Sequence, residues 1–167
     1  GGIEVDWFRR VKKSLLSSEK KQVPDNMWVK CDGCEEIIYK KELSKNLHVC
    51  YKCGYHFRVD SGTYVEMLLD PTTVDEFNAN LRSVDPLEFK ASKKYSDQLK
   101  AARQKTGIEE AVRTVTGSLG EFDIVLAVMD FSFIGGSMGS VVGEKIARAI
   151  DKAREQRKPL IIVSSSG

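Results

Sequence analysis

The sequence predicts an α/β domain preceded by a small metal-stabilised module, and two patterns carry this prediction. The first is a pair of C-x2-C motifs, Cys31 with Cys34 and Cys50 with Cys53, which use all four cysteines of the chain. The second lies in residues 122–163, where two apolar runs flank an amphipathic segment. A strand, a helix and a strand in that order, joined by a right-handed crossover, indicate an α/β core.

The two cysteine pairs predict one structural zinc ion. Two residues between paired cysteines let a tight turn bring both sulfurs onto one metal, and two such turns supply four thiolates. Gly33 and Gly54 lie where such turns often need a residue with positive φ. Short strand-like runs surround both turns, which is typical of a zinc ribbon. The expected ligands are Cys31, Cys34, Cys50 and Cys53.

Other uses of the four cysteines are less favoured. A rubredoxin-like iron site has the same ligand set, and the sequence does not separate it from zinc. Two disulfides need an oxidising compartment, and no signal peptide precedes the cysteines. Four thiolates leave no open position, which argues against a catalytic zinc. His48 and His56 flank the second pair and are interpreted as non-ligands.

Three segments follow from composition and periodicity. Residues 1–22 predict an amphipathic arm that docks on a protein surface, with a membrane surface as the alternative. Residues 23–60 form the zinc ribbon, and residues 61–167 form the larger domain. The net charge of +2 gives no case for a nucleic-acid protein. No apolar run approaches the length of a bilayer span, so a soluble, intracellular protein is expected.

The larger domain predicts helices over 61–69 and 95–105, followed by strands over 112–119 and 122–129. A helix from 141 to about 157 precedes a second buried strand, 160–163. The buried stripe of this helix is expected at Val142, Ile146, Ala149, Ile150 and Ala153. Such a strand followed directly by a Ser/Gly turn predicts that the domain is truncated here.

Two glycine-containing turns follow the two apolar strands. Residues 135–140 carry three glycines before a helix, which suits a phosphate site or an oxyanion hole. A close helix–strand crossing that needs small residues explains them equally well. A second turn, 164–167, is expected to converge with the first on one crevice. No His or Cys occurs in 111–167, so chemistry there must rest on backbone N–H groups.

Several longer motifs carry a resemblance to a known family. They are the run from Trp28 to Cys34, the segment from Asn46 to Phe57, Leu81-Arg-Ser-Val-Asp-Pro86, and the stretch from Phe131 to Lys145 that contains Ile-Gly-Gly-Ser-Met-Gly-Ser. Together they resemble the β subunit of the bacterial and plastid acetyl-CoA carboxylase carboxyltransferase, from about residue 6 onward.

The resemblance implies a fold and an activity. It implies a zinc ribbon followed by a crotonase-like (ββα spiral) domain, truncated at its C-terminal end. It also implies an α2β2 complex with an α subunit, acting with biotin carboxylase and the biotin carboxyl carrier protein. Biotin is supplied in trans, and its carboxyl group passes to acetyl-CoA to give malonyl-CoA. The cytoplasm, or the plastid stroma in a plant, is the implied compartment.

The resemblance also implies site residues. Gly135, Gly136, Ser137, Met138 and Gly139 are expected to line the CoA pocket, and Gly167 to carry an oxyanion-hole amide. The family continues beyond this turn with Gly-Ala-Arg, so the chain alone is expected to be inactive.

Two further roles remain for the ribbon. Basic and aromatic residues around the cysteines suit single-stranded nucleic acid, as an alternative or second function. Otherwise the ribbon caps the larger domain.

Overall fold

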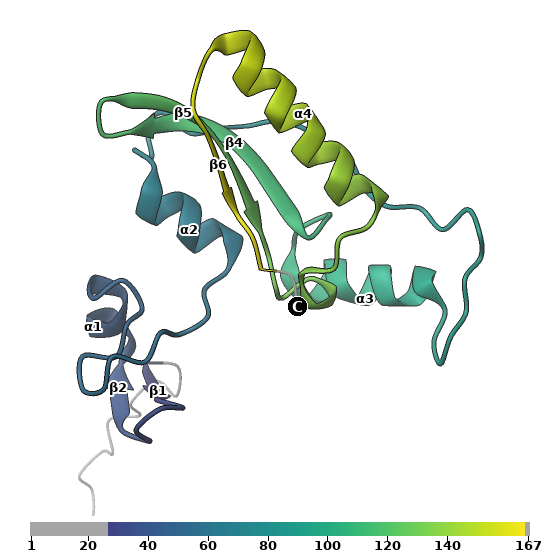
Figure 1. Ribbon diagram of the computed structural model, residues 1–167. Coiled ribbons are helices and arrows are strands. Elements are labelled where there is room, and N and C mark those ends of the chain that lie inside the picture. The colour runs from purple at the N-terminus through teal and green to yellow at the C-terminus, as the bar shows by residue number, and fades with distance from the viewer. Residues whose placement is uncertain (1–26, 166–167) are drawn as a thin grey trace, which may run out of the picture. The chain divides into compact units, whose positions relative to one another are not determined.

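The computed structural model describes residues 27–165, so the predicted arm and Gly167 lie outside the described residues. The chain divides into two compact units between Phe57 and Arg58, a few residues before the boundary expected at residue 60. Residues 27–57 are called the ribbon unit and residues 58–165 the α/β unit, and Figure 1 shows both.

The ribbon unit is built from one hairpin, one short helix and two turns. Strands β1 (Trp28–Lys30) and β2 (Ile37–Tyr39) pair antiparallel around the first cysteine turn. Helix α1 (Lys40–Lys45) was not expected, because its sequence is polar and it buries only Leu43. A single bridge between Val49 and His56 closes the second turn. The buried core consists of Cys31, Ile38, Leu43 and Cys50.

The α/β unit is organised around a four-stranded sheet with the order β3-β4-β5-β6, of which Figure 1 labels β4, β5 and β6. Strands β3, β4 and β5 are antiparallel neighbours, and β6 pairs parallel with β5. The expected strands and the parallel pairing are confirmed, whereas two-residue β3 is too short and polar to have been predicted. The strands are β3 (Asp75–Glu76), β4 (Val112–Leu119), β5 (Phe122–Met129) and β6 (Leu160–Val163).

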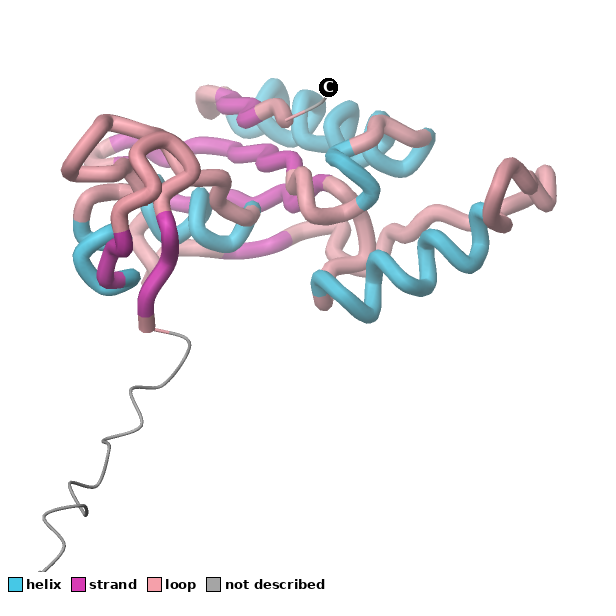
Figure 2. Tube along the Cα trace, turned by 90° about the horizontal axis from the view of Figure 1, so that it is seen from below, coloured by secondary structure: helices cyan, strands magenta, loops and turns pink. Residues whose placement is uncertain are grey.

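Three helices and a 3-10 turn complete the α/β unit, and they confirm the predicted helices. They are α2 (Ser61–Leu68), α3 (Tyr95–Thr106), η1 (Ile134–Gly136) and α4 (Ser140–Gln156). Asp60 caps α2 by accepting the N–H of Thr63 at 2.7 Å, and Gly107 ends α3 with φ of 72°. Figure 2 shows α3 extending away from the strands, and the loop before it joins the far end of this helix.

The two faces of β5 carry separate cores. Val125, Ala127 and Met129 pack in the cluster that includes α3 and α4. Ile124, Leu126 and Val128 pack in the cluster that includes α2. Alternate residues of a strand point to opposite faces, so a continuous apolar run is what a sheet covered on both faces requires. Among residues 27–165, no helix is long and apolar enough to cross a bilayer.

Two burial expectations were wrong. Strand β6 is only partly buried, and Ile162 is 42% exposed, because β6 is the edge of the described sheet. In α4, Ile150 is 48% exposed while Lys145 is only 2% exposed. The stripe that faces β4 and β5 therefore contains Val142, Lys145, Ala149 and Ala153, so it includes a lysine that was not part of the expected buried stripe.

Candidate functional site

The four cysteines form a compact sulfur cluster. Their Sγ atoms all lie within 4.8 Å of one another, which suits the edges of a tetrahedron around one metal ion. Cys31 and Cys50 are buried, and Cys53 is exposed. All four are free thiols rather than disulfides, and neither histidine joins the cluster.

The two cysteine turns repeat the same backbone geometry. The residue after each pair, Glu35 or Gly54, donates its N–H to the carbonyl of the first cysteine at 2.8 Å. The N–H of Cys31 bonds to Glu36, and that of Cys50 bonds to Tyr55, at 2.9 and 2.7 Å. The two turns are therefore superimposable in their hydrogen bonding, although their sequences differ.

Only one of the two glycines predicted to have a positive φ has it. Gly54 has φ of 75°, as expected, but in the first turn the positive φ belongs to Glu35, at 60°. The expectation of a positive φ at Gly33 was therefore wrong. A Cβ on Gly33 would lie 2.9 Å from Cβ of Tyr55 and 3.2 Å from Sγ of Cys53. Gly33 is needed for close packing rather than for its φ.

The electrostatics of the cluster call for a cation. Burial alone raises the pKa of the Cys50 thiol, but hydrogen bonds from the backbone of Cys53 and Lys52 outweigh it and lower this pKa to about 7. A backbone hydrogen bond from Tyr55 favours the Cys53 thiolate, yet partial desolvation of the sulfur and the three neighbouring sulfurs raise its pKa to about 12. Four thiolates therefore coexist only around a positive ion, and the donor set fits zinc.

The glycine-rich turn connects β5 to α4 through backbone of unusual handedness. Ile134, Gly135 and Gly136 follow one another with φ of 47°, 67° and 71°. Gly139 is the N-cap of α4, with extended backbone, and Met138 is 64% exposed. Positive φ at a β-branched residue such as Ile134 is rare and marks local strain.

The turns after β5 and β6 meet directly. A Cβ on Gly136 would lie 2.8 Å from the carbonyl oxygen of Ser165 and 2.9 Å from its Oγ. The predicted convergence of the two turns is confirmed as far as Ser165. This close approach explains Gly136 through packing alone. A Cβ on Gly135 would meet nothing within 4 Å, and one on Gly139 only the hydroxyl of Tyr95 at 3.9 Å.

The backbone N–H groups of this turn are not equally available. Gly136 and Ser137 donate to Phe133 and Ile134, at 3.0 and 3.2 Å, and so stabilise the turn itself. The first N–H groups of α4, which begins at Ser140, have no acceptor within their own helix. An anion placed at this turn would therefore find free N–H groups at the end that adjoins α4, where the helix dipole is positive.

A cavity of about 330 Å³ lies at the carboxyl ends of β5 and β6, where open α/β sheets commonly bind ligands. Ser164 and Ser165 line it together with Met129, the last residue of β5. The guanidinium of Arg58 stacks on Phe131 at 4.0 Å from the ring centroid. The cavity is thus lined by apolar and aromatic side chains, by two serines and by the cation of Arg58.

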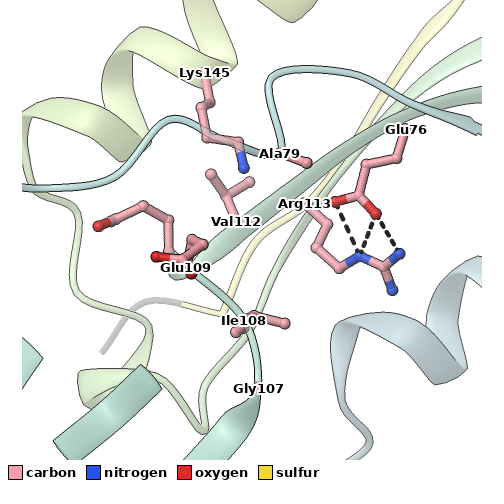
Figure 3. A pocket seen from close by; sticks show the side chains of 9 residues that line it. Glu76, Ala79, Gly107, Ile108, Glu109, Val112, Arg113 and Lys145 are labelled. Carbon is pink, nitrogen blue, oxygen red and sulfur yellow. Dashed lines mark hydrogen bonds and ion pairs between the residues drawn. The ribbon is translucent and has the colours of Figure 1, made fainter. Parts of the chain in front are cut away.

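A second cavity, of about 400 Å³, contains a buried lysine that sequence reasoning missed. Figure 3 shows Lys145 reaching from α4 toward Val112 and the segment around Glu109. The acids on the cavity wall are engaged elsewhere, because Arg113 pairs with Glu76 at 2.5 Å and Arg103 pairs with Glu109 at 3.2 Å. Burial therefore lowers the pKa of the Lys145 ammonium, although Glu76 and Glu110 oppose the shift.

Comparison with known proteins agrees with these features. The sequence family described as the acetyl-CoA carboxylase zinc finger domain matches residues 28–53. A protein of Chlorobaculum tepidum named acetyl-coenzyme A carboxylase carboxyl transferase subunit beta is 47% identical over 161 residues. Its counterpart in Chlorobium limicola, with the same name, is 48% identical. Both alignments cover 96% of this chain and 58% of the relative.

The resemblance to the carboxyltransferase β subunits is confirmed. This chain spans 58% of the length of these curated relatives. The match of residues 28–53 to the zinc finger domain, together with the sulfur cluster, makes the ribbon unit a zinc site.

Solved structures support the fold over about two thirds of this chain. A single-chain, multi-domain long-chain acyl-CoA carboxylase matches with a TM-score of 0.52 at 18% identity, covering 66% of this chain and 11% of that one. The transcarboxylase 12S structure with methylmalonyl-coenzyme A matches with a TM-score of 0.51 at 23% identity, covering 66% and 19%. The expected crotonase-like α/β class is therefore confirmed, and at these identities the likeness concerns the fold alone.

Proposed function

We propose that this chain supplies the acetyl-CoA side of a biotin-dependent carboxyltransferase. As part of the β subunit of acetyl-CoA carboxylase carboxyltransferase, this chain would help to transfer a carboxyl group from carboxybiotin to acetyl-CoA, which gives malonyl-CoA. The observation that carries the proposal is the 47% identity to a named β subunit over 96% of this chain. The comparisons give no support to the nucleic-acid alternative.

The chemistry asked of this chain is electrostatic. Proton removal from the thioester methyl group places negative charge on the thioester oxygen, and backbone N–H groups at a helix N-terminus stabilise such a charge. We assign this role to the part of residues 135–139 that adjoins α4, where Gly139 caps the helix. Gly167, which lies outside the described residues, remains proposed as a further oxyanion donor.

The remaining components are also proposals. The α subunit, in an α2β2 complex, would complete the site, and biotin would arrive on its carrier protein after loading by biotin carboxylase. The zinc ribbon has no open coordination position and would act structurally. Cytoplasm, or plastid stroma in a plant, is the proposed compartment.

The test is malonyl-CoA decarboxylation with biotin as acceptor, catalysed by the complete β subunit with and without its α subunit. Zinc content is measured on the same samples. We expect activity only when both subunits are present, with about one zinc per β chain. A folded, zinc-loaded mixture without activity would contradict the proposal.

A further inference from the structure

Asp130 is a buried carboxylate that the proposed chemistry does not use. It directly follows β5 and is 3% exposed. Burial of a carboxylate is unfavourable unless every lone pair finds a donor.

Four donors converge on Asp130, two from Ser61, which is distant in sequence, and two from the nearby Ser132. Oδ2 accepts the N–H of Ser61 at 2.8 Å and its hydroxyl at 2.7 Å. Oδ1 accepts the N–H of Ser132 at 2.9 Å and also its hydroxyl. Although burial opposes it, these hydrogen bonds lower the pKa of Asp130, so the carboxylate is charged at neutral pH.

The two segments have different positions in the fold. Ser132 begins the path from β5 into the glycine-rich turn, and Phe133 donates to the carbonyl of Asp130 at 3.3 Å. Ser61 is the first residue of α2 and is 1% exposed. In sequence it follows the ribbon unit after only a few residues. One carboxylate thus joins the start of α2 to the turn that leads to Gly136.

We propose that Asp130 is a positioning residue that fixes the glycine-rich turn, with Ser61 as its anchor. Ile134 to Gly136 have left-handed backbone, which costs free energy at Ile134 and persists only where neighbouring structure imposes it. Asp130 supplies that constraint at the entrance of the turn, and contact with Ser165 supplies it at Gly136. This inference rests on the proposed function only for its kinetic consequence.

The decisive variant is Asp130→Asn in the complete β subunit with its α subunit. The amide presents N–H groups to serines that already donate, so the hydrogen bonds to one of the two serines are lost. Asp123→Asn is the matched control, because Asp123 lies at the opposite end of β5, is exposed, and bonds to Ser118. Hydrogen exchange of residues 131–139, kcat, KM and thermal stability are measured for both variants.

For Asp130→Asn we expect hydrogen exchange in residues 131–139 to be about tenfold faster or more. This increase corresponds to the loss of one hydrogen bond to a charged group. The rest of the sheet keeps its exchange rates, and kcat falls more than KM rises. The control matches the wild type. Exchange and kcat equal to the control, or exchange accelerated uniformly over the sheet, would overturn the inference.

Two milder variants cover the case in which Asp130→Asn does not fold. Ser61→Ala and Ser132→Ala each remove one hydroxyl donor and keep the N–H donor. Both are expected to accelerate exchange in 131–139, and wild-type exchange in both would overturn the inference. An inactive wild-type complex would instead contradict the proposed function, while the exchange comparison would still decide the role of Asp130.

Discussion

The ribbon unit and the α/β unit are stabilised by different means. Two of the four buried residues in the ribbon core are cysteines, so its centre is a metal site rather than an apolar core. The α/β unit instead buries alternate residues of β5 against helices on both faces of the sheet. Removal of zinc should therefore affect the ribbon unit strongly and the α/β unit little.

Loss of a zinc ligand should produce the largest effect. Cys31→Ala removes a fully buried sulfur, and structural zinc contributes on the order of 10 kcal/mol to the folding of such modules. We expect loss of zinc and unfolding of the ribbon unit, measured by zinc content and circular dichroism. Asp32→Ala, which changes an exposed neighbour, is the control. Retention of stoichiometric zinc by Cys31→Ala would contradict the four-sulfur site.

Gly136→Ala should have the next largest effect. Its positive φ disfavours a side chain by about 1–2 kcal/mol, and the new Cβ would also clash with the backbone of Ser165. We therefore expect at least about 2 kcal/mol of destabilisation in denaturant unfolding. Gly139→Ala, with φ of −91° and only an ordinary contact with the hydroxyl of Tyr95 at 3.9 Å, should cost much less. Equal costs for the two variants would disprove the close contact between the turns.

Lys145→Met should stabilise the α/β unit at neutral pH by about 1–4 kcal/mol, because it replaces a buried ammonium that has no ion pair among residues 27–165 by an apolar chain. Below its lowered pKa, Lys145 is charged in both the folded and unfolded states, and folding bears the full desolvation cost. As pH rises from that pKa toward 10.5, the unfolded chain binds more protons, so wild-type stability increases.

The advantage of Lys145→Met should therefore shrink in alkaline solution. Thermal unfolding between pH 7 and 10 measures it, with Lys100→Met on the exposed face of α3 as the control. A stability difference that grows with pH would contradict the assignment of a lowered pKa.

Substitutions of the positive-φ residues in the two cysteine turns should have the smallest effect on stability. Gly54→Ala places a side chain at φ of 75° and should cost about 1 kcal/mol, whereas Glu35→Gly relaxes φ of 60° and should change stability by less. Glu35 also pairs with Lys30 at 3.3 Å, but this exposed pair contributes little. Zinc competition with a chelator ranks the variants. A larger loss for Glu35→Gly would show that the turns are not equivalent.

Sequence reasoning succeeded where the pattern is local and failed where burial depends on distant neighbours. The apolar run from Phe122 to Met129 and the C-x2-C spacing predicted β5 and the metal cluster. Partial exposure of β6 depends on its place at the sheet edge, and burial of Lys145 depends on which stripe of α4 faces the sheet. Neither position is encoded in periodicity.

The role of Asp130 had a weak local signal. An aspartate directly after a buried strand, followed two residues later by a serine, is typical of a turn in which the side chain accepts nearby N–H groups. The partner Ser61, 69 residues away in sequence, has no such signal. The link between Asp130 and Ser61 could therefore be recognised only from the fold.

The most direct test of the difference between the units is hydrogen exchange of the complete chain before and after zinc is removed with a chelator. We predict that amides of residues 27–57 lose their protection while those of β4 and β5 keep it, because only the ribbon unit has a metal at its centre. A ribbon that stays protected without zinc, or a sheet that loses protection together with it, would contradict this account.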